Sequence, residues 1–97
     1  MIIFSYNTIK SFADAYPDSR NALNNWYIIF TKADFANFNA VREIFGSVDA
    51  VRNDLYVFNI KGNHYRLIVR IHFNVRTVYI KFIGTHKQYD NLDLNLL

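Results

Sequence analysis

The chain has 97 residues, of which 52% are hydrophobic and 18% aromatic, so it can build one domain around one core. It contains no cysteine, which excludes disulfides and thiolate metal sites and fits a reducing compartment. The start MIIFSYN lacks the basic segment of a signal peptide, and no apolar run approaches the ~20 residues of a membrane helix. We therefore expect a soluble cytoplasmic protein, a single domain over residues 1–97.

Residues 1–54 read as a short strand followed by helices. MIIF can form the strand, and Ile9, Phe12, Ala13 and Tyr16 then follow at helical spacing. Asn7 is the expected N-cap of this helix, Pro17 ends it, and Asp18 can cap the next one. The second helix carries an apolar stripe, and a third should run from Asn39 to Phe45 and end at Gly46 in the left-handed conformation. The stripe consists of Leu23, Trp26, Tyr27 and Phe30.

From Leu55 the period of the pattern changes to two, which predicts antiparallel strands over residues 55–85 with one buried face. In HYRLIVRIHF the alternate apolar residues form the core face, and the opposite face is polar except for Ile68. In TVYIKFIG the expected core residues are Val78, Ile80 and Phe82. Residues 86–97 form a polar motif and a tail. The predicted fold class is therefore α+β, with the helices on one face of a small antiparallel sheet.

Two turns set the expected strand register. Gly62-Asn63 is a favourable hairpin loop and would pair Asn59 with Arg66. If Val75-Arg76 is the tip of the second turn, Arg66 lies opposite Thr85, and the remaining pairs follow. These further pairs are Arg70 with Lys81 and His72 with Tyr79. Neighbouring registers two residues apart are also open, and each keeps the same facing and puts Arg66 near the start of THKQYD. In this register the polar run THKQYD starts beside Arg66, above a sheet face left open by the helices. That face carries Lys61, His64, Arg70, Tyr79 and Lys81.

The positive charge is concentrated on the predicted strands. The net charge is only +3, yet residues 55–89 contain six Lys and Arg side chains, no acidic residue and all three histidines. This asymmetry indicates a polyanionic partner, although a basic face that only contacts solvent would give the same pattern.

Several kinds of chemistry do not fit the sequence. The acidic residues and histidines lack metal-ligand spacing, all serines lie in the first half outside any nucleophile elbow, and no phosphate-binding loop is present. We therefore expect neither metal nor cofactor. RNA cleavage by the ribose 2′-hydroxyl fits better, because it needs only cations and one or two proton-transferring groups.

Candidate residues for this chemistry lie on the predicted strands HYRLIVRIHF and TVYIKFIG and in the polar run THKQYD. Arg66 could brace the phosphate, and His86 is suited to acid or base work. Tyr89 and Lys87 could share that role, and Tyr89 or Tyr79 could stack on a base. The structural alternatives are that THKQYD only caps a short helix from Thr85 and that Tyr89 is a core aromatic. The residue pattern therefore indicates RNA binding and leaves catalysis open.

FNIKGNHYRLIVRIHF followed by VYIKFIGTHKQYD resembles the HigB family of bacterial toxins in the RelE-like superfamily. The similarity includes the GN turn, the YRL strand and the closing G-T-H-x-x-Y-D, and it extends over roughly residues 1–93. In the first half, YPDS, Trp26 and TKADF also fit the family.

The resemblance implies an mRNA interferase, the toxin of a type II toxin–antitoxin system, which inhibits translation by cutting mRNA on the ribosome without a metal. The implied partners are mRNA, the ribosome and a HigA-like helix-turn-helix antitoxin, with no membrane. By analogy Arg66, His86 and Tyr89 are the catalytic candidates, and Lys61, Lys81 and Lys87 contact phosphates. Many relatives carry an acid where Gln88 stands.

Two other functions remain open. One is a non-catalytic RNA- or ribosome-binding module that uses the same basic face. The other is an interaction protein whose sheet face serves only a protein partner. Metal-free cleavage products would separate catalysis from binding, and strong salt dependence of RNA binding would argue against the purely protein-binding function.

Overall fold

The structure, a computed structural model, describes residues 1–97 and contains one five-stranded sheet in the order β1-β5-β4-β3-β2. The strands are β1 (Ile2–Phe4), β2 (Asp49–Ala50), β3 (Leu55–Ile60), β4 (Tyr65–His72) and β5 (Thr77–Thr85). The α-helices are α1 (Tyr6–Ala15), α2 (Arg20–Lys32), α3 (Phe38–Ile44) and α4 (His86–Asp90). Short 3₁₀ turns lie at Pro17–Ser19, Phe73–Val75 and Leu94–Leu96.

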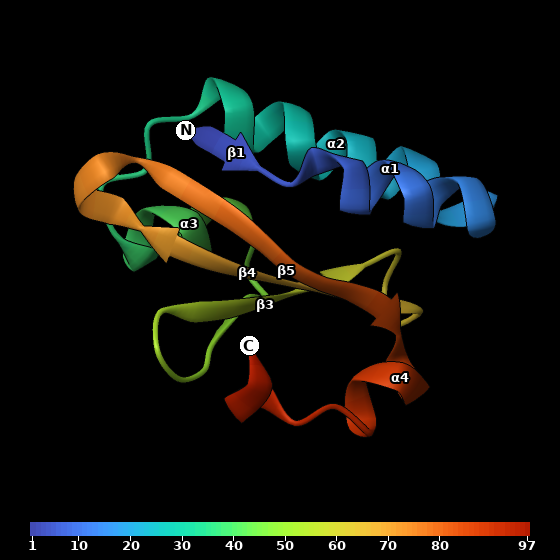
Figure 1. The fold of residues 1–97 in the computed structure, drawn as a ribbon. Coiled ribbons are helices and arrows are strands. Elements are labelled where there is room, and N and C mark those ends of the chain that lie inside the picture. Colours follow the sequence, from blue (N-terminus) through green and yellow to red (C-terminus); the bar gives the residue numbers. More distant parts are fainter.

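The sheet lies between two unequal layers. In Figure 1, α1 and α2 run side by side over one face, whereas α4 and the C-terminal segment lie below the other. The α+β class with the N-terminal helices on one face is confirmed. None of the helices has the length and apolar character that crossing a membrane requires.

The helical spacing in the sequence correctly located the residues that pack onto the sheet. Leu23, Trp26 and Phe30 of α2 are fully buried, and Ile9 of α1 joins them in the main core. Some expected helix ends are wrong. The N-cap of α1 is Ser5 rather than Asn7. The third helix ends at Ile44, and Gly46 is absent from the positive-φ residues.

The β3–β4 hairpin has the predicted register, with Asn59 opposite Arg66 and Phe58 opposite Leu67. The connecting turn spans four residues rather than two, and both Lys61 and Gly62 have positive φ. Glycine adopts this conformation without a steric cost, which accounts for its presence here. The turn therefore sets which side chains of β3 lie beside Arg66.

The observed β4–β5 register near the turn differs by two residues from the pairing expected for a Val75-Arg76 tip, and it is one of the neighbouring registers that the sequence analysis left open. Arg70 pairs with Tyr79 and His72 with Thr77, because residues 73–76, which include a 3₁₀ turn, form a connection of four residues instead of two. A bulge in β5, opposite Ile68 and Val69 of β4, then shifts the pairing by one residue, so that Arg66 lies opposite Gly84, next to Thr85. A bulge re-aims the side chains that follow it.

The bulge also changes which residues of β5 face the core. Lys81 is the extra residue, since Ile80 pairs with Val69 and Phe82 with Ile68. Phe82 was expected on the helix-facing side, but it packs on the opposite face, and Ile83 contacts the main core instead. Side chains alternate between the two faces along a strand, so a single inserted residue moves each later side chain of β5 to the opposite face of the sheet.

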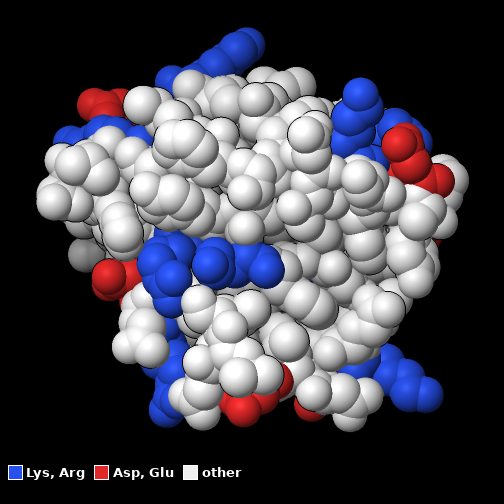
Figure 2. All heavy atoms as spheres, in the orientation of Figure 1, with Lys and Arg blue, Asp and Glu red and all other residues white.

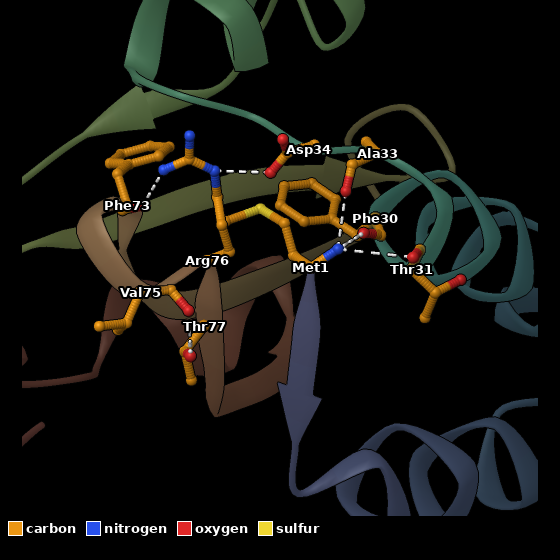
Figure 3. A network of polar contacts seen from close by, with 9 residues as sticks. All are labelled: Met1, Phe30, Thr31, Ala33, Asp34, Phe73, Val75, Arg76 and Thr77. Atoms are coloured by element: carbon orange, nitrogen blue, oxygen red, sulfur yellow. Dashed lines mark hydrogen bonds and ion pairs between the residues drawn. The ribbon is translucent and has the colours of Figure 1, made fainter.

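The first strand adds a parallel pair, so the sheet is mixed. Ile2 lies opposite Thr77 and Phe4 opposite Tyr79. Figure 3 shows how this end is held: the Met1 amino group lies 3.0 Å from the Phe30 carbonyl oxygen and 2.7 Å from that of Ala33. These carbonyls belong to the C-terminal end of α2, where a cation is favoured.

The loop after α2 is tied to the same end of the sheet. Nε of Arg76 donates to Oδ1 of Asp34 at 2.6 Å, and the guanidinium also reaches the Phe73 carbonyl. Arg76 has positive φ and closes the turn before β5. The Arg76 side chain therefore has a structural role, since it joins the turn before β5 to the loop after α2.

The second face of the sheet is not the open polar surface that we expected. Leu55, Val57 and Ile68 form a small apolar cluster there, covered mainly by the C-terminal segment. The covering side chains are Phe82, Tyr89, Leu92, Leu94 and Leu97. Ile68, which interrupts the polar face in the sequence, is therefore buried because it belongs to this apolar cluster.

Asp18 does not cap α2, whose N-cap is Ser19. Instead the Tyr65 hydroxyl donates to Oδ1 of Asp18 at 2.5 Å, and Nζ of Lys61 lies 3.0 Å from Oδ2. The hydrogen bond from Tyr65, followed by the one from Lys61, lowers the pKa of Asp18 below 3.8. The bond to Asp18, with some desolvation, raises the pKa of Tyr65 from 10.0 to about 12. This contact joins the segment between α1 and α2 to the β3–β4 hairpin.

Replacing Tyr65 by Phe should remove a stabilising contact whose strength depends on pH. Because the pKa of Tyr65 is raised in the folded protein, the contribution of its hydroxyl to stability is complete below pH 10 and is lost as the pH rises towards 12. The lowered aspartate pKa means that its contribution is complete above its unfolded value of 3.8 and is lost as the pH falls through the folded value. Denaturant unfolding of both proteins across pH should show a stability difference with a plateau between these limits.

Tyr27→Phe is the matched control, since it also removes one tyrosine hydroxyl. A Tyr65→Phe protein whose stability parallels that of the wild type at every pH would contradict the assignment.

Candidate functional site

Arg66 lies near the start of β4 on the face that points away from α1 and α2, and only 9% of it is exposed. Nη1 donates to the carbonyl oxygens of Asn63 at 3.1 Å and Tyr65 at 3.2 Å. The guanidinium carbon lies 6.0 Å from the centre of the Tyr89 ring, at the limit of a cation–π contact. The hairpin turn and α4 thus hold the side chain from two sides.

No carboxylate neutralises this arginine. Arg66 forms no ion pair, and its hydrogen-bond acceptors are two backbone carbonyls and, at 3.5 Å, the amide oxygen of Asn63. Removing a charge from water without a counter-ion is costly, so such groups are usually paired. An almost buried guanidinium with only neutral partners is therefore suited to an anion that arrives from outside, and its planar fork matches a phosphate.

The helix α4 is set at the end of β5 by a capping box. The Thr85 side chain accepts from the Gln88 backbone at 3.1 Å, and Oε1 of Gln88 accepts from the Thr85 backbone at 2.9 Å. Glu and Gln both serve at this position of a capping box, which accounts physically for the glutamine here. The structural alternative for THKQYD, a helix capped by Thr85, is thus confirmed, and this cap determines where His86 and Tyr89 lie.

Gly84 makes room for this cap. A Cβ atom at residue 84 would come within 2.7 Å of Oε1 of Gln88 and 2.5 Å of the Phe82 ring. Because Gly84 is also the cross-strand partner of Arg66, both the arginine and the capped helix depend on this position.

His86 is the exposed proton-transferring candidate. Its Nδ1 lies 2.9 Å from Oδ2 of Asp90, one turn further along α4. A carboxylate only accepts, so Nδ1 carries the proton and Nε2 is left to interact with a ligand. The backbone N–H of His86 donates to the carbonyl of His64 at 3.1 Å, which places both histidines at one end of the sheet.

The structure groups the other predicted RNA-binding residues differently from the sequence analysis. His64 and Lys87 are exposed near Arg66, in the turn and in α4. Lys61 is ion-paired with Asp18. Arg70 is held by the carbonyls of Asn53 at 3.1 Å and Leu97 at 3.2 Å. Tyr79 lies opposite Arg70, four positions along β4 from Arg66, and Lys81 occupies the bulge between them.

Two residues that hold the site were missed in the sequence. Asn63 was read only as a turn residue, but its carbonyl oxygen at 3.1 Å and its amide oxygen at 3.5 Å both accept hydrogen bonds from Arg66. Gly84 appeared only as the first residue of G-T-H-x-x-Y-D, and the sequence assigned it no role. Both roles depend on the chain folding back on itself, so no local pattern reports them.

The candidate site is an open surface. The structure has one pocket, which lies over α3 and the segment leading to β2, and none of the candidate residues lines it. Basic atoms cross the middle of the face seen in Figure 2, with acidic atoms nearer its margins. No three or more His, Asp or Glu side chains come close enough together to hold a metal ion. The groups available to a ligand are therefore cations, imidazoles and a phenol.

The fold is thus a small basic α+β domain in which a nearly buried, unpaired arginine lies beside a short capped helix that carries His86 and Tyr89. The profile of a family described as the HigB toxin, RelE-like toxic component of a toxin–antitoxin system, matches residues 19–92. A relative named mRNA interferase HigB from Escherichia coli O6:H1 is 32% identical over 95% of this chain and 91% of its own length. The mRNA interferase toxin HigB of Escherichia coli strain K12 is 28% identical over 93% of this chain and 88% of its own. The chain belongs to the HigB toxin family.

Proposed function

We propose that this chain is an endoribonuclease, an mRNA interferase, that cleaves mRNA on the translating ribosome without a metal ion. The observation that carries the proposal is the guanidinium of Arg66, which is 9% exposed and has only neutral partners. The names of the two relatives, mRNA interferases both, agree with it. We also propose that a HigA-like helix-turn-helix antitoxin neutralises the toxin.

In the proposed reaction the ribose 2′-oxygen attacks the adjacent phosphorus. A base removes the 2′-hydroxyl proton, the new O–P bond forms, and the bond from phosphorus to the 5′-oxygen breaks as an acid protonates that oxygen. The products are a 2′,3′-cyclic phosphate and a 5′-hydroxyl. Arg66 stabilises the charge that develops on the phosphoryl oxygens.

His86 and Tyr89 are the proposed proton-transferring pair. Asp90 orients His86 through Nδ1, so that Nε2 exchanges the proton. Tyr89 packs against Arg66 and can hydrogen-bond the reacting phosphate or stack on a base. His64 and Lys87 lie at the same end and supply phosphate contacts.

An open site supports a role for the ribosome. The candidate residues line no pocket, so few contacts would hold a flexible mRNA in the geometry that in-line attack requires. A ribosome that already holds the codon would supply this positioning.

Cleavage of a defined mRNA, free and on programmed ribosomes, tests the proposal. We expect fragments with 5′-hydroxyl and 2′,3′-cyclic phosphate ends, faster on the ribosome, and no cleavage where a single 2′-deoxynucleotide replaces the scissile ribose. Fragments with 5′-phosphate ends, or cleavage at the deoxy position, would refute the mechanism. Binding to RNA or ribosomes without any cleavage would instead establish a non-catalytic binding module.

A further inference from the structure

Exposed apolar side chains gather at the β1–β5 end of the sheet. Phe4 is 49% and Tyr79 37% exposed, and Ile2 and Val75 are more exposed still. Ile2 and Phe4 belong to the edge strand, so no strand lies beyond them in the sheet. Isolated exposed apolar residues are common, but a contiguous group that includes aromatic rings indicates a binding surface.

Two of these side chains form a stacked aromatic pair. The rings of Phe4 and Tyr79 are 5.3 Å apart and inclined by only 12°. The His72 and Tyr79 ring centres lie 5.6 Å apart with the ring planes inclined by 66°, an edge-to-face arrangement. The parallel pairing of β1 with β5 and the antiparallel pairing of β5 with β4 bring these rings together.

This aromatic platform, made of Phe4, Tyr79 and His72, lies on the same face as Arg66. Tyr79 is the cross-strand partner of Arg70, which shares its side of β4 with Arg66. The four-residue separation on β4 corresponds to about 13 Å. Lys81 is exposed at the bulge of β5 between the two positions. A cation thus lies on the path from the platform to Arg66.

We infer that the aromatic platform stacks on a base of the mRNA, a short distance along the strand from the scissile phosphate bound at Arg66. This inference rests on the proposed function and adds a second contact to its site. Single-stranded RNA is bound by aromatic rings that stack on bases together with cations that follow the backbone. The platform and Lys81 supply both kinds of group.

The composition of the surface favours RNA over a protein partner. The rings of Phe4 and Tyr79 already stack on each other, so that a base would extend this stack, and the neighbouring charged side chains on β4 and β5 are Arg70 and Lys81. Residues 55–89 contain no acid that would repel a phosphate. A docking site for aliphatic side chains would not need planar rings.

The test compares Phe4→Leu, which keeps an apolar side chain on β1, with Phe4→Trp, which keeps an aromatic ring. The probe is an mRNA oligonucleotide with 2′-O-methyl riboses, which prevents cleavage, and with one abasic position moved along the strand. Its binding is measured free in solution and on programmed ribosomes. Ile28→Ala, another half-exposed apolar residue on α2, is the matched control, and circular dichroism verifies each fold.

We expect one abasic position, removed from the scissile phosphate, to weaken wild-type binding about tenfold. Phe4→Leu should lose a similar factor and become insensitive to that abasic position, whereas Phe4→Trp and Ile28→Ala should bind as the wild type does. Unchanged RNA binding by Phe4→Leu, or equal effects of all abasic positions, would overturn the inference. So would a Phe4→Leu toxin that binds RNA normally but escapes its antitoxin, because the surface would then dock that protein.

The result is separable from that of the proposed function. If the wild type cleaves mRNA and Phe4→Leu cleaves and binds equally well, the platform is wrong and the ribonuclease stands. If the abasic and Phe4 effects are found but unmodified mRNA is never cut, the platform stands and the catalytic function is wrong.

Discussion

Arg66→Ala is expected to reduce mRNA cleavage about 10²- to 10³-fold, the loss typical of removing one group that stabilises developing charge. The reason is that Arg66 is the guanidinium held without a counter-ion beside His86 and Tyr89. The measurement is single-turnover cleavage on programmed ribosomes, together with growth after induced expression. An Arg66→Ala protein that cleaves at the wild-type rate would refute its role.

Loss of the Arg66 guanidinium should not unfold the protein. The charge of Arg66 is nearly buried and has only neutral partners, so replacing it by an apolar side chain removes a desolvation cost. We expect Arg66→Met to be inactive yet at least as stable as the wild type in denaturant unfolding. Arg42→Ala, on α3, is the matched control for loss of one arginine and should keep full activity. An inactive variant with much lower stability would instead identify Arg66 as a structural residue.

Trp26→Ala is expected to lower the free energy of unfolding by about 3–5 kcal/mol. Trp26 is 1% exposed, stacks on Phe30 at 4.5 Å and meets Phe58 of the sheet edge-on at 5.7 Å. Small domains have a total stability of only about 5–15 kcal/mol, so the variant should be partly unfolded at physiological temperature. Circular dichroism must follow the unfolding, because Trp26 is the sole tryptophan.

Two further variants separate the loss of packing from other effects. Trp26→Phe keeps an aromatic ring and removes an indole nitrogen that has no hydrogen-bond partner, so its cost should be much smaller. Ile28→Ala, on the exposed side of the same helix, should change stability by less than about 0.5 kcal/mol. A similarly small effect of Trp26→Ala would show that this aromatic cluster does not hold α2 on the sheet.

Much of the fold followed from periodicity. The stripe of Leu23, Trp26 and Phe30 was visible because helical neighbours recur every three to four residues, and each of these side chains is buried in the core. Alternation in β3 and β4, with the glycine turn between them, was enough to set Asn59 opposite Arg66. These features depend on residues that are close together in the sequence.

The candidate site was predictable in part. The sequence placed Arg66 near Thr85 and recognised THKQYD as a polar group at the end of a strand, and their proximity follows from the sheet. It did not show that Arg66 is nearly buried among neutral partners, which include Asn63 and Tyr89. Burial depends on which segments cover a residue, and for Arg66 these come from the turn and from α4.

The sequence by itself indicated the three N-terminal helices, the first strand and the three long strands, together with the basic character of residues 55–89 and the side chains available for chemistry. Only the tertiary structure decided the parallel pairing of Phe4 with Tyr79, the bulge at Lys81 and the covering of Ile68 by the C-terminal segment. The physical reason is the distance along the chain between the residues that interact. Periodicity and turn chemistry act between neighbours, whereas these contacts join residues far apart in the chain and depend on the packing of the whole sheet.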